Sequence, residues 1–206
     1  MKNIILIRHG KVEEKFQNKL YGQLDVNLSL KGLQKSEEAV EILKKLPISK
    51  IYSSPLKRCL YPAKLLSSIK KIPLFVKQEI QEINFGDWTG KTFEELMKDP
   101  LFWESYKNEN IKPPNGESRK EFFLRVKKFI EEFKNEKFSG IAVVFTHAGV
   151  IRAFFCQIFK LGIEAFFKVE ILPLKGTCFT FYPDNQIVMK GLNLPLEHLS
   201  QILEDI

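Results

Sequence analysis

Short apolar segments alternate with helical patterns along this chain, and this alternation most constrains its fold. Four segments are predicted strands: residues 4–7, 48–52, 73–76 and 141–145. The first reads Ile-Ile-Leu-Ile, and a run that is apolar throughout is typical of a strand buried on both faces of a parallel sheet. Strands that alternate with helices predict an α/β fold, with a mainly parallel sheet and helices on both faces.

Local signals predict where the helices begin and end. Ser29 is the expected N-cap of a helix that stops at Pro47, and Ser54-Pro55 is the expected N-cap and first residue of the next helix. The sequence further predicts capping boxes at 92–95 and 118–121, a helix over 150–161, a hairpin of 178–182 and 186–190, and a small helical excursion around 96–115. No linker or repeat interrupts the chain, so a single domain over 1–206 is predicted.

The composition excludes several classes of protein. Of the 206 residues, 44% are hydrophobic and 28% are charged, which is typical of a globular chain that buries a core without disulfides or metals. No apolar run is long enough to cross a membrane, and the N-terminus lacks the pattern of a secretory signal. The three cysteines are widely spaced, which argues against a disulfide framework or a thiolate zinc site. We therefore expect a cytoplasmic protein that does not bind membranes.

The net charge of +7 permits nucleic-acid binding, but its distribution does not favour it. Lysines alternate with glutamates in helical patterns, which indicates solvated helix faces, and no nucleic-acid-binding motif is present. Only five of the 32 basic residues are arginines. In a chain that uses lysine almost everywhere, an arginine indicates a place where a rigid fork of donors matters.

Three polar clusters follow predicted strands, at the end where α/β sheets bind ligands. They are Arg8-His9-Gly10, residues 53–58 and residues 146–149, and they hold two of the five arginines and two of the three histidines. The third histidine, His198, is expected at the surface. Taken singly, each cluster also fits a structural hydrogen-bonding pair or a plain helix start. Together they predict an oxyanion site, with phosphate the best candidate, because guanidinium groups and helix N-termini bind phosphate oxygens.

A phosphoryl-transfer site also needs a proton donor for the leaving oxygen. Glu82 lies in a loop flanked by apolar and aromatic residues, a setting that suits general-acid work. Asp87 and Glu79 are local competitors, and an ordinary loop carboxylate is the alternative interpretation. A zinc centre is not expected, because no companion ligands accompany His147 and no H-E-x-x-H motif is present.

Five ordered elements make the chain resemble the histidine phosphatase superfamily, which has the phosphoglycerate mutase-like fold. The resemblance covers roughly residues 2–193. The elements are Leu6-Ile7-Arg8-His9-Gly10, Ser53-Ser54-Pro55-Leu56-Lys57-Arg58, Glu82 with Phe85-Gly86-Asp87-Trp88-Thr89-Gly90, Gly116-Glu117-Ser118, and Thr146-His147-Ala148-Gly149-Val150-Ile151-Arg152.

This resemblance implies a role for each residue, whereas the residues alone leave open which histidine attacks. His9 is the implied nucleophile and forms a phosphohistidine, and Glu82 is the acid and then the base. Arg8, Arg58 and His147 bind the phosphoryl oxygens, with no metal or other cofactor. The implied substrate contacts are Gly10, Gly22, Gln23, Lys57 and Ala148.

Features of two loops are similar to those of α-ribazole phosphatases, which implies α-ribazole 5′-phosphate, a precursor in cobalamin assembly, as substrate. Ile83 and Phe85 stand where phosphoglycerate mutases carry Arg and Tyr, which favours a phosphatase. The usual Asn of the first loop is displaced, and either Gln23 or Asn18 takes its place. Aromatic residues of the excursion either line a wall for a nucleoside-like group or simply pack the core.

The sequence leaves the oligomeric state and several alternative functions open. The expected partner is a small phosphorylated metabolite, and the sequence leaves open whether the protein is a homodimer. The alternatives to an α-ribazole phosphatase are a broad-specificity phosphatase, a phosphoglycerate mutase, and a non-catalytic module that binds a phosphorylated ligand. A nucleic-acid binder is a further alternative, supported by net charge alone.

Overall fold

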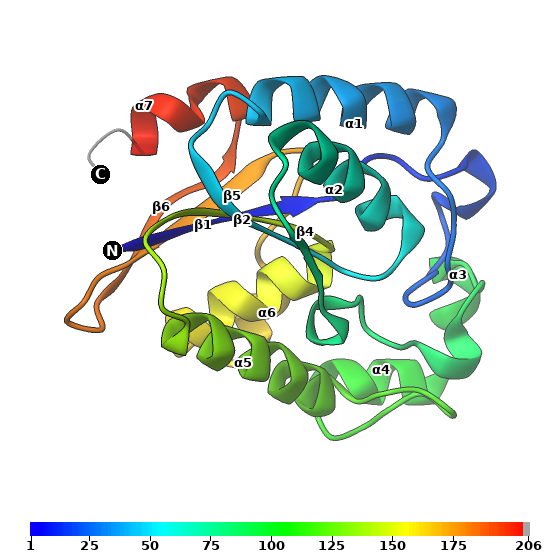
Figure 1. Cartoon of the computed structure of the whole chain (residues 1–206). Coiled ribbons are helices and arrows are strands. Elements are labelled where there is room, and N and C mark those ends of the chain that lie inside the picture. Colours follow the sequence, from blue (N-terminus) through cyan, green and yellow to red (C-terminus); the bar gives the residue numbers. More distant parts are fainter. Residues whose placement is uncertain (204–206) are drawn as a thin grey trace.

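A six-stranded sheet runs through the centre of the protein in the computed structural model, which describes residues 1–203 (Figure 1). Its strands are β1 (Lys2–Arg8), β2 (Ile48–Ser53), β3 (Leu74–Val76), β4 (Gly140–Thr146), β5 (Gly176–Phe181) and β6 (Ile187–Leu194). They are ordered β3-β2-β4-β1-β5-β6. The first four of these in space are parallel, and β5 and β6 form an antiparallel hairpin at the edge. The predicted fold class and hairpin are confirmed.

Helices cover both faces of this sheet. They are α1 (Leu30–Leu43), α2 (Lys57–Lys70), α3 (Phe93–Leu96), α4 (Pro100–Lys107), α5 (Arg119–Asn135), α6 (Ala148–Ile158) and α7 (Leu199–Leu203). One face carries α1, α2 and α7, and the other carries α5 and α6, while α3 and α4 form the predicted excursion beyond the sheet (Figure 1). Within residues 1–203, no helix has the length and apolar character needed to cross a bilayer.

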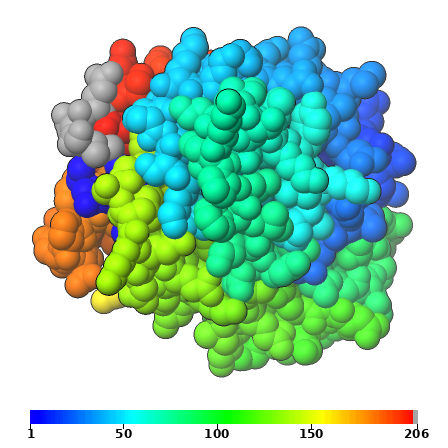
Figure 2. Space-filling view, viewed as in Figure 1, coloured from blue at the N-terminus to red at the C-terminus, as the bar shows by residue number. Residues whose placement is uncertain are grey.

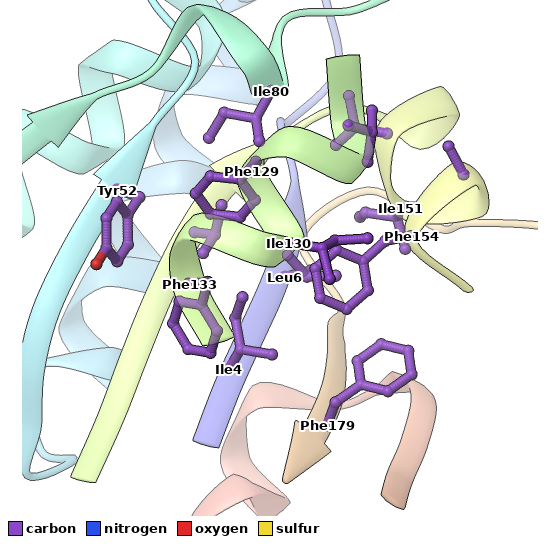
Figure 3. Close-up of a cluster of buried hydrophobic side chains, with 14 of the residues drawn as sticks. Ile4, Leu6, Tyr52, Ile80, Phe129, Ile130, Phe133, Ile151, Phe154 and Phe179 are labelled. Atoms are coloured by element: carbon purple, nitrogen blue, oxygen red, sulfur yellow. The ribbon is translucent and has the colours of Figure 1, made fainter. Parts of the chain in front are cut away.

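The alternation of side chains along β1 divides the core into two layers. Ile5 and Ile7 pack toward α1 and α2, whereas Ile4 and Leu6 pack among the phenylalanines of α5 and α6 (Figure 3). Successive side chains of a strand point to opposite faces, so a strand covered by helices on both sides must be apolar throughout. All four residues are fully buried, as the sequence pattern predicts.

Helix caps follow the sequence closely at three points. The side chain of Ser29 caps α1, and complete capping boxes open α3 at Thr92 and α5 at Ser118. These caps form because a side-chain oxygen satisfies an amide that the helix itself leaves unpaired. The exposed His198 also agrees with its predicted surface position.

Two helix boundaries differ from the prediction. The helix expected to begin at Ser54-Pro55 begins at Lys57, with Leu56 as its N-cap. The Ser54 hydroxyl lies 2.8 Å from Nε2 of His147, so it serves a polar cluster rather than the end of a helix. The predicted 150–161 helix instead spans 148–158, because Lys160 adopts a left-handed φ of 52° that closes it early. The single domain predicted over 1–206 stays a prediction, and its last three residues lie outside the described part.

Strand register brings the polar clusters to one edge of the sheet. Arg8 pairs in register with Thr146, and Ser53 pairs with Phe145. The amide of His9 continues the ladder by donating to the carbonyl of Thr146 at 3.0 Å. Each cluster follows its strand directly, so three segments far apart in sequence meet at the carboxyl end of the sheet.

A loop and a helical segment close over this edge. The loop of residues 10–29 meets the segment that carries α3 through an isolated bridge between Lys19 and Thr92. The amide of Leu20 also donates to the carbonyl of Lys91 at 2.9 Å. Figure 2 shows the blue N-terminal segment beside the green segment at the right of the molecule. Together they form a wall beside the strand ends.

Truncating a core phenylalanine of α5 tests this packing. Phe129→Ala removes a side chain that is 1% exposed, and we expect it to lower the free energy of unfolding by about 3–5 kcal/mol. Leu124→Ala on the same helix is the control, because Leu124 is 59% exposed and its loss should cost within about 0.5 kcal/mol. Urea unfolding measures both, and similar costs for the two variants would contradict the assignment of the buried face.

Candidate active site

A cavity of about 370 Å³ lies at the carboxyl end of the sheet. Arg8 and His9 enter it from the end of β1, Glu82 from a loop, and Ala148 and Gly149 from the start of α6. Aromatic side chains line much of the remainder: Tyr21, Phe85, Trp88, Phe93, Phe102, Tyr106, Phe166 and Phe167. The cavity thus joins a polar group of residues to an aromatic wall.

His9 is held in one orientation and one protonation state. Its Nδ1 lies 2.8 Å from the carbonyl oxygen of Gly10. Because a carbonyl only accepts, Nδ1 carries the proton and Nε2 keeps its lone pair. Burial, and after it the positive charge of Arg58, holds the pKa of His9 well below its usual range. The imidazole is therefore neutral near pH 7 and has a free nitrogen.

His147 lies behind His9 and is fully buried. The two imidazole rings meet edge to face with centroids 5.3 Å apart. Nε2 of His147 lies 2.8 Å from the hydroxyl of Ser54 and 3.5 Å from the thiol of Cys59. Burial, followed by the charge of Arg58, also holds the pKa of His147 well below its usual range.

Two arginines flank the histidines from different elements. Arg58, in the first turn of α2, is fully buried, donates to the carbonyls of Gly22 and Leu24, and lies 4.9 Å from the centre of the Tyr21 ring. Arg8 donates to the carbonyl of Ile171 at 2.6 Å. The buried Nε of each arginine has no hydrogen-bond partner among residues 1–203. Each guanidinium thus keeps one unpaired donor; Arg8 lines the cavity, whereas Arg58, like His147, lies behind its lining.

Glu82 is positioned by backbone amides. Its carboxylate accepts from the amide of Ile83 at 3.1 Å and from the amide of Gly149, at the start of α6, at 3.2 Å. Its carbonyl accepts from Gln23 at 3.0 Å and from Arg125 at 3.2 Å. A Cβ at Gly149 would overlap Oε1 of Glu82, so the carboxylate keeps this position only while residue 149 is a glycine. Side chain and backbone of Glu82 are thus both fixed.

The two competing carboxylates lie elsewhere. Glu79 pairs with Lys128 at 2.9 Å, and Asp87 accepts from the side chain of Asn115 at 3.1 Å. Neither lines the cavity. The geometry therefore favours Glu82 among the three acids considered from the sequence.

The predicted substrate contacts divide into two groups. Gly22 and Ala148 line the cavity, and Gln23 reaches it indirectly through its bond to Glu82. Gly10 instead allows the chain to pack against α1, and Lys57 is exposed and pairs with Asp25 at 3.6 Å. The structure therefore does not bring the side chain of Lys57 to the cavity, because this residue begins a helix that points it outward.

Neither candidate for the displaced Asn of the first loop lines the cavity, although Gln17, Lys19 and Gly22 beside them do. The amide of Gln23 donates to the carbonyl of Glu82, whereas Asn18 has no such contact with the site among residues 1–203. Which of the two takes the place of the Asn stays open.

Sequence reasoning named the arginines as special without assigning three of them. Arg119 and Arg152 line the cavity, and Arg125 binds the Glu82 carbonyl and pairs with Glu117 at 2.6 Å. With Arg8 and Arg58, all five arginines of the chain therefore lie in or around this site. The signal was the rarity of arginine in a lysine-rich chain. Tyr21 and Tyr106 were also missed, since no local pattern marks them.

This arrangement suits attack on an electrophilic phosphorus. It places a neutral imidazole nitrogen, guanidinium donors and a fixed carboxylate around one cavity, which are the groups needed for nucleophilic and general acid–base catalysis. Among the described residues, no group of three His, Cys, Asp or Glu side chains is arranged to hold a metal ion.

Comparisons with known proteins agree with this geometry. The model of the histidine phosphatase superfamily (branch 1) matches residues 4–194. Phosphoserine phosphatase 1 of Hydrogenobacter thermophilus is 30% identical over 171 residues, which cover 82% of this chain and 81% of that protein. The adenosylcobalamin/alpha-ribazole phosphatase of Escherichia coli K12 is 24% identical, over 81% of this chain and 83% of that protein.

Solved structures share the fold. The native structure of a mycobacterial glucosyl-3-phosphoglycerate phosphatase superposes with a TM-score of 0.81, covering 94% of this chain and 99% of that chain at 22% identity. At that identity the match concerns the fold alone.

The two buried histidines make stability depend on pH. Their folded-state pKa values lie below those of the unfolded chain, so the unfolded state binds more protons as pH falls. We expect the free energy of unfolding to decrease below about pH 6.5, by at most about 2.7 kcal/mol per pH unit for two imidazoles. Urea titrations between pH 7.5 and 5 measure this slope.

Replacing one imidazole tests the cause of that slope. His147→Gln should lower the slope by the share of one imidazole, and the exposed His198→Gln is the matched control. A slope in His147→Gln equal to that of the wild type would contradict the assignment.

Proposed function

The chain belongs to branch 1 of the histidine phosphatase superfamily, and its relatives include phosphoserine and alpha-ribazole phosphatases. We propose that it hydrolyses small phosphorylated metabolites through a phosphohistidine formed on His9. The orientation of His9 is the observation that carries this proposal. Its Nδ1–H donates a hydrogen bond to the carbonyl of Gly10, so only Nε2 has a lone pair free to attack.

The first step transfers the phosphoryl group to the enzyme. Nε2 of His9 attacks the phosphorus, the N–P bond forms, and the bond to the leaving oxygen breaks. Glu82 in its protonated form gives its proton to that oxygen. The free donors of Arg8 and Arg58 stabilise the charge on the phosphoryl oxygens, so no metal ion is needed.

The second step returns the enzyme to its starting state. The carboxylate of Glu82 takes a proton from a water molecule, whose oxygen attacks the phosphorus. The N–P bond breaks, and phosphate and a neutral His9 are released. We assign His147 to the same phosphoryl group because its ring lies 5.3 Å from that of His9, centre to centre. Its bond to Ser54 and its own burial keep it neutral and in place.

Residues that line the cavity support one substrate and one reaction over the alternatives. The aromatic wall with Trp88 and Phe102 supports a substrate with a flat ring, such as α-ribazole 5′-phosphate. Ile83 and Phe85, which also line the cavity, favour hydrolysis over the mutase reaction. Ranking kcat/KM over a panel of phosphorylated metabolites that includes α-ribazole 5′-phosphate tests the first choice. To test hydrolysis against the mutase reaction, the release of phosphate is compared with phosphoryl exchange in the presence of a bisphosphoglycerate primer.

Trapping the phosphoenzyme tests the nucleophile. A brief pulse of a ³²P-labelled phosphomonoester should label the wild-type protein with a bond that is labile in acid and stable in base. His9→Ala should carry no label and should lose more than about 99% of turnover, because His9 is the one histidine that lines the cavity among residues 1–203. His198→Ala, which changes an exposed histidine, is the control.

The same assays test independence of metal. Labelling and turnover should both persist in EDTA. A loss of turnover in EDTA that a divalent ion restores would contradict the proposed mechanism, as would wild-type turnover in His9→Ala.

A double-mutant cycle tests Glu82. Glu82→Gln should lower kcat/KM for alkyl phosphates about 10²- to 10⁴-fold, but should affect p-nitrophenyl phosphate much less, because its leaving group needs no proton. Gly149→Ala should act in the same direction, since its new Cβ displaces the Glu82 carboxylate. Steady-state kinetics with both ester types measure the effect.

The double variant identifies the route of the Gly149 effect. If Gly149→Ala acts through Glu82, combining it with Glu82→Gln should cost little beyond Glu82→Gln alone. Fully additive losses would show that the glycine acts elsewhere.

A further inference from the structure

The guanidinium of Arg119 lies in the cavity without an ionic partner. Arg119 is the first residue of α5 and is only 7% exposed. Its Nε and Nη2 are buried and have no hydrogen-bond partner, and among residues 1–203 no carboxylate lies within 4 Å of it. A buried cation in this state is costly unless something pairs with it.

Aromatic rings hold Arg119 in place. Its guanidinium carbon lies 5.0 Å from the centre of the Phe167 ring and 5.6 Å from that of Tyr106. These two rings stack on each other with centroids 4.5 Å apart. The rings fix the guanidinium plane through cation–π contact but leave the N–H donors unused. The arginine is thus positioned in advance of any ligand.

Arg152 brings a second cation to the same part of the cavity. Its Nε donates to the carbonyl of Val169 at 2.7 Å, and among residues 1–203 no carboxylate lies within 4 Å of this guanidinium either. Burial raises the pKa of Tyr106, and the charges of both Arg119 and Arg152 oppose this. The hydroxyl of Tyr106 therefore lies within the fields of both guanidiniums.

The carboxylates of the cavity do not neutralise these cations. Glu117 is paired with Arg125 at 2.6 Å and forms no ion pair with Arg119. Glu82 is bound to two backbone amides and is assigned to proton transfer. The charge of Glu109 reaches Arg119, and the charges of Glu82 and Glu170 reach Arg152, but only from a distance. Among residues 1–203 neither guanidinium forms an ion pair within 4 Å.

We propose that Arg119 and Arg152 form a second anion subsite, which binds a carboxylate or a second phosphate on the alcohol portion of the substrate. This inference rests on the proposed phosphatase function and narrows its substrate class to phosphomonoesters that carry another anionic group. Paired guanidinium donors match both kinds of oxyanion. The alcohol portion of α-ribazole 5′-phosphate is uncharged, so the subsite disfavours it relative to an anionic substrate.

Substrate pairs that differ in one group test the proposal. 3-Phosphoglycerate and glycerol 1-phosphate share a three-carbon skeleton, and 6-phosphogluconate and glucitol 6-phosphate share a six-carbon one; only the first of each pair carries a carboxylate. Fructose 1,6-bisphosphate against fructose 6-phosphate tests a second phosphate instead. In at least one pair we expect kcat/KM to favour the more anionic ester at least tenfold. Equal values within all three pairs would overturn the proposal.

Substitutions at Arg119 and Arg152 test whether these residues cause the preference for the more anionic ester. Arg119→Met keeps an apolar side chain against the rings but removes the charge, and it should reduce the preference toward unity. Arg119→Lys should restore part of it. Lys120→Met removes a charge from the neighbouring exposed position and should keep the wild-type preference. A preference unchanged in both Arg119→Met and Arg152→Met would refute the subsite.

Folding and activity are separated by two further measurements. Thermal melting shows whether each variant is folded. If Arg119→Met is unfolded, the substrate preference is measured in Arg152→Met instead. If no phosphoenzyme forms on any ester, the proposed function fails while the subsite remains testable by calorimetry. In that case 3-phosphoglycerate should bind the wild-type protein at least tenfold more tightly than glycerol 1-phosphate, and equal affinities would overturn the subsite.

Discussion

The parallel pairing of β1 with β4 is the contact on which the site depends. It sets Arg8 beside Thr146, and the amide of His9 extends it by one further hydrogen bond. Both strands are buried on both faces, so a shift of one residue would place apolar side chains in the wrong layer. The packing of the core thus fixes the relative heights of His9 and His147, which lie far apart in the sequence.

A concentration of positive charge in a buried setting explains most of the chemistry. Burial and the nearby guanidiniums keep His9 neutral, and a neutral imidazole is the form that can attack phosphorus. The same guanidiniums, notably Arg58, retain unpaired donors for the phosphoryl oxygens. In the proposed mechanism, one electrostatic feature therefore serves both the nucleophile and the group that it receives. Its cost is the burial of guanidinium groups that form no ion pair among residues 1–203, and in the proposed function an anionic substrate supplies the missing charge.

The walls of the cavity come from segments outside the sheet. The loop after β1, residues 85–88, the α3–α4 excursion and residues 163–167 supply its aromatic side chains. These segments are where members of one fold are free to differ, because the sheet does not depend on them. Arg119 belongs to this outer group, at the start of α5 and beneath two stacked rings. In the proposed function, the catalytic groups therefore lie at the sheet edge, and the groups that select the substrate lie in the segments around it.

The sequence by itself determined the α/β class, the strands, the caps at Ser29, Thr92 and Ser118, and the gathering of Arg8, His9 and the other clusters at one edge, because periodicity and capping are local. Only the tertiary structure decided which nitrogen of His9 is free, which carboxylate faces the cavity, and that Lys57 points away from it. It alone brought Arg119 and Arg152 together with the site. These depend on how separate helices and loops pack, and no local pattern encodes a contact between distant segments.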